Sequence, residues 1–509
     1  MNKSAALLCL VLALSLPIHA QDNLALATTF EGSFDSETGL SNLAEIDFGF
    51  TSGQFDLSAV LFINNDGKYL PLESNQAGGT FFDYYAFMKS GGIAWRPDPA
   101  ISLKFGRLEH RDQLDGPYSL FVSSAAPSAL MGQLRYENDY FFYESRWVEL
   151  NSRSSMYTEA YYKEPNYLNP LDPDSGPLHL NDPLGESNGP FPDRGANVKA
   201  YGFKFGNGMR FGFQDAAIYT GRSFDFEYLI NPIPQYFIQY VKKTDGRPWA
   251  TGDNENNLIG AFWDWQVNDR LKLDAQFLMD DFNVYFLGIG KWNPWKAAWA
   301  ASAKVGTDVG TFGFYHAGAL KYTFQPTRDN MDEAYSYTYY PDSRFKIGSE
   351  YAAIPLSDLM FGYKHGENNI AFMADYSGQV LGMDLYSSLE FVLSGSKSPT
   401  NAWHDATWHN YDGSHLLDES VLEKLFLLSA SAKKRLGNFY LYGNLALGVA
   451  VNALELVQPT PVVDSRGKLG DKAINKYSYI WKPGDDTRLI YGVSFGARYN
   501  IPVMGLFSK

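Results

Sequence analysis

The densest group of chemically capable side chains lies between residues 403 and 415. It combines flat aromatic rings with histidines and carboxylates: Trp403, His404, Asp405, Trp408, His409, Tyr411, Asp412 and His415. Aromatic rings stack on the C–H faces of sugars, while His and Asp side chains hydrogen-bond sugar hydroxyls. The segment therefore suits glycan binding, with contacts expected from Trp403, His404, Trp408, His409 and Tyr411. A wet loop with a few buried aromatics is the plainer alternative.

The same segment is a poor metal site, and the chain lacks the familiar catalytic motifs. His404 and His409 do not have the i, i+4 helical spacing of a zinc motif. No Gly-x-Ser-x-Gly elbow and no His-Glu-x-x-His motif occurs. Asp112 near His110, or His316 in a predicted strand, would serve a hydrolase only with spatial partners that the sequence does not reveal. We expect no enzyme activity, no metal and no cofactor.

Asp280 and Asp281 form a second candidate glycan contact, directly after a predicted strand over 271–279. Carboxylates at a strand end can bind sugar hydroxyls, cap a loop backbone or hold calcium. The plainer interpretation is that this pair organises the 220–256 segment. Within that segment, Asn231-Pro232 predicts a turn rather than a contact, because Pro fixes its own backbone and biases its predecessor toward extended geometry.

The elements that position these residues are strands with two different faces. In the last of them, Leu489, Tyr491, Val493 and Phe495 alternate with smaller or polar residues that end in Arg498. The segments 101–106, 271–279 and 439–452 alternate in the same way, which is typical of strands between lipid and water. The polar faces predict a wet lumen lined by Lys104, Lys272, Asp274, Gln276, Asn444 and Arg498.

Short and long connections alternate from Glu137 onward. We expect short turns at 206–208, 268–269, 307–310, 355–358 and 436–438, and long loops at 151–197, 220–256, 324–345, 395–422 and 453–486. Short turns on one rim and long loops on the other are typical of outer-membrane barrels. Alternation gives about 20 candidate strands. Two are doubtful: 81–95 is interrupted by Gly91-Gly92, and the Ser/Ala-rich run in 118–130 could be a short helix.

The chain begins with a predicted signal peptide at 1–20. Lys3 is followed by an apolar run from Ala5 to Leu16 and by a small residue, Ala20, at the expected cleavage site. That run is too short for a membrane helix, which needs about 20 residues. The only cysteine, Cys9, lies within it, so the mature chain should contain no thiol. Residues 21–509 contain no clear linker or sharp repeat and predict a single domain.

A stretch in the middle of the chain resembles the Wzi-like capsule-assembly outer-membrane proteins. An aromatic strand is followed, in the family's order, by Tyr228-Leu229-Ile230-Asn231-Pro232, Asn257-Leu258-Ile259-Gly260 and Asp280-Asp281-Phe282. The resemblance implies an 18-stranded barrel whose lectin-like outer surface attaches or organises surface polysaccharide. It also implies that two of the candidate strands are wrong.

These observations together predict an all-β, transmembrane, antiparallel outer-membrane β-barrel of about 18 strands (16–20), with long extracellular loops and short periplasmic turns, in a diderm bacterium. The expected partners are outer-membrane lipid, surface polysaccharide and the barrel-assembly machinery. Nucleic acid is not expected, because the net charge is -15. The alternative function is a porin-like channel for small solutes, since a wet lumen fits both. Long loops favour polysaccharide attachment or a plugged barrel, whereas a row of basic side chains beside an acidic loop would favour a channel.

Overall fold

The structure is a computed structural model. It describes residues 23–36, 39–66, 80–81, 84–114, 116–151, 167–168, 177–178, 193–242, 255–281, 294–325, 336–341, 343–347, 350–400, 414–457 and 479–501. The predicted signal peptide lies outside these residues. None of the helices within them is long and apolar enough to cross a membrane.

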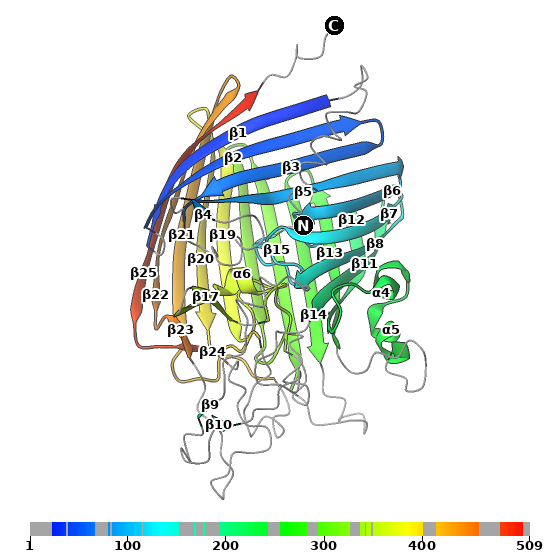
Figure 1. Ribbon diagram of the computed structural model, residues 1–509, viewed down its shortest axis with the longest axis vertical. Coiled ribbons are helices and arrows are strands. Elements are labelled where there is room, and N and C mark those ends of the chain that lie inside the picture. The colour runs from blue at the N-terminus through cyan, green and yellow to red at the C-terminus, as the bar shows by residue number, and fades with distance from the viewer. Residues whose placement is uncertain are drawn as a thin grey trace, which may run out of the picture.

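Eighteen antiparallel strands close into a barrel, which confirms the predicted fold class (Figure 1). They are β1 (Asn23–Asp35), β2 (Gly39–Ser52), β3 (Phe55–Asn64), β5 (Tyr84–Asp98), β6 (Ile101–Leu108), β7 (Ala129–Glu137), β8 (Phe141–Asn151), β11 (Arg194–Phe205), β12 (Met209–Thr220), β13 (Glu255–Asn268), β14 (Leu271–Asp281), β15 (Lys296–Thr307), β16 (Gly310–Ala319), β19 (Asn369–Val380), β20 (Met383–Ser394), β21 (Glu423–Leu436), β22 (Phe439–Val451) and β25 (Thr487–Ile501). Each strand pairs with the next, and β25 pairs with β1 from Leu26↔Ile501 to Asp35↔Gly492.

The connections define a short-turn rim and a long-loop rim. Tight turns follow β2, β5, β7, β11, β13, β15, β19 and β21, and they form the short-turn rim, where β1 begins and β25 ends. The other connections form the long-loop rim, and all but the short link from β1 to β2 are long. They carry α4 (Phe226–Ile230), α5 (Gln235–Lys242) and α6 (Leu356–Leu359), the short strand β4 (Thr80–Phe81), and the two-stranded sheets β9–β10 (Tyr167–Leu168, Pro177–Leu178), β17–β18 (Arg344–Ile347, Glu350–Ala353) and β23–β24 (Leu454–Val457, Ile480–Pro483).

Two local predictions are wrong. Residues 355–358 are no turn between barrel strands: they begin α6, because the N–H groups of Asp358 and Leu359 both donate to Pro355 O. The candidate strand or helix at 118–130 is neither, since β7 begins only at Ala129.

Gly91-Gly92, by contrast, lies within an uninterrupted β5. A Cβ on Gly106, in the neighbouring β6, would lie 2.5 Å from Gly92 Cα, and Gly106 has φ +141°. Both glycines therefore serve a close approach of two backbones, which only residues without a side chain permit. The pair marks an irregular contact within the sheet rather than a strand end.

The outer face of the barrel is an apolar belt, and the predicted alternation of β25 is confirmed. Leu489, Tyr491 and Phe495 are between 44% and 69% exposed, whereas Ser494 on the opposite face is 8% exposed. The neighbouring β22 presents Leu441 and other large apolar residues outward in the same way. Apolar residues that alternate outward along neighbouring strands form the surface that contacts lipid.

The inner face of β8 to β20 is not simply wet, because irregular segments from the long-loop rim pack against it. We call residues 109–114, 116–128, 320–325, 336–341 and 354–368 the plug. Its side chains Leu120, Phe121, Tyr337 and Phe361 are fully buried against small or aliphatic wall residues such as Ala196, Val198, Ala216, Leu258, Leu278, Ala298, Ala317 and Ala371. The barrel therefore holds a dry hydrophobic core on this side of its lumen.

Candidate functional site

Asp112 fixes the first part of the plug to the wall. Its Oδ2 accepts hydrogen bonds from Phe121 N (2.8 Å), Val122 N (3.2 Å) and Gln276 Nε2 (3.0 Å), and its Oδ1 accepts one from Gln214 Nε2 (2.6 Å). Gln276 in turn accepts from Leu120 N at 2.8 Å. Asp112 Oδ1 also accepts from Gln113 N at 2.7 Å. One carboxylate thus satisfies three backbone donors of the plug and two amide groups of β12 and β14, which makes this contact strong.

Two charged residues of the wall, Arg194 and Glu390, also bind the plug. The buried Arg194 at the start of β11 donates to Ser336 O (2.9 Å) and Thr338 O (3.0 Å). On the other side, Glu390 in β20 accepts from Lys364 Nζ at 2.8 Å and contacts His365 Nε2 at 2.9 Å. A buried charge is tolerated only when such partners are present, so these contacts specify one position of the plug.

His110 lies in the plug and takes no part in a catalytic arrangement. Its Nε2 lies 2.9 Å from the hydroxyl of Tyr339, and its ring contacts Phe361. Burial lowers the pKa of His110 to about 3, and the nearby Arg146 acts in the same direction, while the Pro127 backbone and Glu144 oppose it. The imidazole is therefore neutral throughout the physiological range, and its role in this environment is packing.

The predicted glycan segment is attached to the plug at both ends. Residues 401–413, which include Trp403, His404, Trp408, His409 and Tyr411, lie outside the described residues. Before them, Ser398 N donates to Glu367 Oε1 at 2.6 Å. Asn368 contacts the chain both before and after residues 401–413: its Nδ2 donates to Ser396 O (3.0 Å), and its Oδ1 accepts from Leu417 N (2.8 Å). The plug thus fixes where this loop leaves the barrel and where it returns.

His415, directly after this segment, shows the same attachment. Its carbonyl accepts from Lys321 N at 2.8 Å, and its Nδ1 lies 2.8 Å from Asp418 Oδ2. The ring meets that of Tyr322 edge to face at a centroid distance of 6.0 Å. A histidine and a tyrosine therefore lie together where the aromatic-rich loop returns to the plug.

Asp280 contacts the plug. Its Oδ2 accepts from Gln325 N at 3.1 Å. A bulge between Met279 and Asp281 changes the register at this strand end, and Asp281 pairs with Lys296 of β15. Asp280 thus caps the backbone of a loop, one of the three roles that its position allowed.

The residues predicted to line the lumen lie on three parts of the wall. Lys272 and Asp274 share the inner face of β14 with Gln276, as the register with β13 and β15 shows. Lys104 lies opposite Gln133 in β7. Asn444 Nδ2 donates to Ser494 Oγ at 2.8 Å, and Arg498 forms an ion pair with Asp47.

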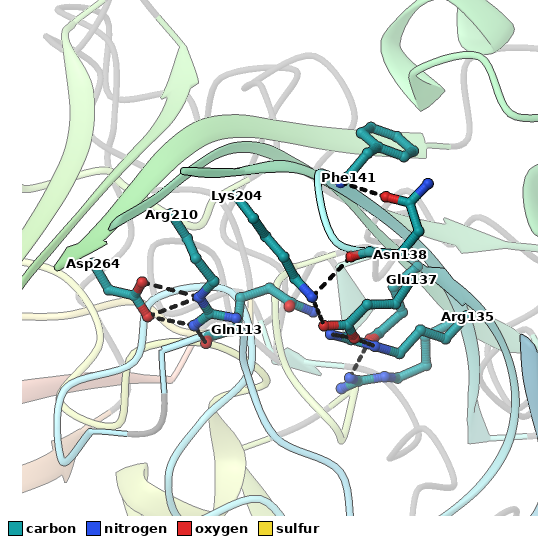
Figure 2. Close-up of polar contacts among 10 residues, drawn as sticks. Gln113, Arg135, Glu137, Asn138, Phe141, Lys204, Arg210 and Asp264 are labelled. Atoms are coloured by element: carbon teal, nitrogen blue, oxygen red, sulfur yellow. Dashed lines mark hydrogen bonds and ion pairs between the residues drawn. The ribbon is translucent and has the colours of Figure 1, made fainter. Parts of the chain in front are cut away.

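Ion pairs cover the wall between the plug and the short-turn rim (Figure 2). Arg135 bridges Glu137 (2.6 Å) and Glu144 (2.8 Å), and Arg210 Nε donates to both oxygens of Asp264 at 2.9 and 3.0 Å. Sequence reasoning missed these residues and Arg194, and it considered Asp112 only as a hydrolase candidate near His110. In the sequence the missed residues are visible only as charged side chains on the inward face of a predicted strand. Such a position does not reveal which residue the charge pairs with.

The plug does not cover every inner face. A cavity of about 300 Å³ lies against β21, β22 and β25. Its lining is polar and basic: Ser431, Ala432, Lys433, Tyr440, Tyr442, Asn444 and Arg498. Two cationic side chains, Lys433 and Arg498, line this hollow in the lumen wall.

Comparisons with known proteins agree with this architecture. No protein-family model and no curated protein sequence matches the chain. Among solved structures, Wzi from Escherichia coli, described as an outer-membrane protein involved in group 1 capsule assembly and a carbohydrate-binding β-barrel, is similar with a TM-score of 0.50 at 10% identity, over 98% of this chain and 88% of Wzi. The outer-membrane protein opdK from Pseudomonas aeruginosa has a TM-score of 0.44 at 11% identity, over 95% and 100% of the two chains. The chain therefore has an outer-membrane β-barrel fold.

Replacing Asp112 should loosen the plug. In Asp112→Ala, three backbone N–H groups and two amide groups lose their common acceptor, so we expect the free energy of unfolding to fall by about 3 kcal/mol. Guanidinium unfolding in detergent would measure this, and limited proteolysis would locate new cleavage within 109–128. Asp308→Ala is the control, because Asp308 forms only an exposed pair with Arg270 and should cost less than about 1 kcal/mol. Equal losses in the two variants would contradict the role of Asp112.

Acid should destabilise the plug through His110. The unfolded state binds a proton near pH 6.5 but the folded state only near pH 3, so stability is lost as pH falls through this window. Between pH 7.5 and pH 5 the loss from this one group should be about 2 kcal/mol. His110→Gln should remove that portion of the pH dependence of unfolding. An unchanged pH dependence in this variant would show that His110 titrates normally.

Proposed function

We propose that this protein binds or organises polysaccharide at the surface of the outer membrane through its long-loop rim, with the barrel and plug as a rigid support. The observation that carries the proposal is the attachment of both ends of the 401–413 segment to Glu367 and Asn368 of the plug. A loop whose ends are fixed loses less conformational entropy on binding, so its aromatic residues bind a ligand more tightly.

The chemistry of that segment supports a sugar ligand. Two tryptophans, a tyrosine and two histidines provide ring faces for C–H groups and donors or acceptors for hydroxyls. The motif resemblance to capsule-assembly proteins and the fold shared with a barrel described as carbohydrate-binding point the same way. A shared fold is only an analogy for function, so the proposal depends on the segment itself.

Substitutions in the loop and in its attachment test the proposal separately. Trp403→Ala and Trp408→Ala should each weaken binding of the host's own surface polysaccharide to reconstituted protein by about 1 kcal/mol, or about fivefold. Asn368→Ala should also weaken binding although it leaves every aromatic ring in place. Co-sedimentation of vesicles with labelled polysaccharide provides the measurement.

The matched control is Trp265→Ala, because this tryptophan lies at the short-turn rim, where its Nε1 donates to Asn207 O at 3.2 Å. It should bind polysaccharide as the wild type does. If the Trp403 and Trp408 variants also bind normally, the 401–413 segment is not the binding surface and the proposal fails.

A small-solute channel is the second candidate, and the basic cavity beside β21, β22 and β25 favours it. If this side of the lumen conducts, Lys433 and Arg498 should make it prefer anions, and Lys433→Glu with Arg498→Glu should reverse that preference. Conductance in planar bilayers decides between the two functions. Steady large openings by the wild type would contradict a plugged support, whereas a silent bilayer would exclude the channel.

A further inference from the structure

The described part of the connection between β12 and β13, residues 221–242, lies outside the barrel wall (Figure 1). We call residues 221–242, which contain α4 and α5, the outer strap, and Figure 1 shows both helices beside the wall near β11. The strand register agrees with this placement. Val198, Ala200 and Ala216 face the plug and the lumen, so Lys199 and Asp215 between them face outward, toward the strap.

The strap turns its backbone carbonyls toward polar side chains of the wall. Lys199 Nζ donates to Asn231 O (2.6 Å) and Ile233 O (2.8 Å). Ser145 Oγ donates to Leu229 O (2.7 Å), and Tyr201 OH donates to Pro232 O (2.8 Å). Asn231-Pro232 lies in the link between α4 and α5, and the backbone of Asn231 is extended, as predicted for a residue before Pro. The carbonyls of this link also contact the wall.

Several other polar groups of the strap also have partners on the wall or within the strap. Gln235 N donates to Asp215, and Pro232 and Pro234 have no N–H to satisfy. Near the ends of the strap, Asp225 caps α4 and pairs with Arg222 and Lys242, both at 2.7 Å. These contacts satisfy part of the strap's backbone without water, as a position within hydrocarbon requires.

The outer surface of the strap is apolar. Eight large apolar side chains there are between 40% and 65% exposed: Phe224, Phe226, Ile230, Ile233, Tyr236, Phe237, Tyr240 and Val241. The belt of the barrel continues beside them through Phe203, Phe211 and Phe277, which point outward from β11, β12 and β14. The apolar surface thus passes from the wall onto the strap.

The depth of the covered polar patch places it within the membrane. Lys199 lies six residues before the end of β11 at the short-turn rim. With a rise of about 3.3 Å per residue and a tilt of about 45°, that is roughly 14 Å above the rim, near the middle of an apolar band about 25 Å tall. An uncovered lysine there would face lipid, which is unfavourable for a barrel.

We propose that the outer strap is immersed in the acyl chains of the leaflet on the long-loop side. The strap covers a polar area of the wall, centred on Lys199 and Asp215, and presents to the lipid an apolar surface that is continuous with the belt. This inference is independent of the ligand at the long-loop rim, because it rests on the opposite face of the wall.

Site-specific fluorescence tests the proposal in the complete mature protein. Cys9, the only cysteine, lies in the predicted signal peptide, so single cysteines can carry an NBD label. Phe237→Cys and Ile233→Cys report on the strap. Phe277→Cys is the lipid reference, and Asp418→Cys, whose side chain is 53% exposed at the long-loop rim, is the water reference. Only protein with the heat-modifiable gel mobility of a folded barrel is reconstituted into phosphatidylcholine vesicles.

Nitroxide groups on the acyl chains should quench the strap labels to the same extent as the Phe277 label. Aqueous iodide should quench them several-fold less than the Asp418 label. Strong iodide quenching with little nitroxide quenching would overturn the proposal and place the strap in water. Protection from both quenchers would overturn it as well, because a protein partner or a second copy would then cover the surface.

Discussion

The pairing of β1 with β25 is the constraint on which the rest of the structure depends. It joins residues more than 450 positions apart in sequence, from Leu26↔Ile501 to Asp35↔Gly492, and it leaves the described wall without an open edge. In a membrane this closure is obligatory, because an unpaired edge would expose backbone groups to hydrocarbon. Once closed, the wall is a fixed frame with two faces, and each face carries segments that have no regular structure of their own.

β11 shows how strongly those segments change the usual pattern. A barrel strand normally presents apolar residues to lipid and polar residues to the lumen. In β11 the order is reversed, since Val198 and Ala200 face inward while Asn197 and Lys199 face outward. The reversal follows from what covers each face: the plug makes the inner side dry, and the outer strap supplies carbonyls on the outer side.

This reversal also explains how much the sequence could predict. β22 and β25 lie between lipid and a polar interior, so their alternation was readable and their faces were assigned correctly. The plug could not be predicted, because residues 109–128 and 354–368 lack periodicity and are stabilised by contacts far apart in sequence, such as Asp112 with Gln276. The predicted turn at 355–358 is wrong for the same reason. A Pro-Leu-Ser-Asp sequence fits both a turn and a short helix, and the burial of Leu359 and Met360 favours the helix.

The contacts of the plug argue for a permanent filling rather than a movable gate. Displacing it would leave the buried Arg194 without the carbonyls of Ser336 and Thr338, and would separate Glu390 from Lys364. Breaking buried charge pairs costs far more than sliding an apolar surface, because each partner is left without compensation. The apolar core around Phe121 and Phe361 would be exposed at the same time. The wall and the plug therefore behave as one packed unit, and the long-loop rim inherits its rigidity from that unit.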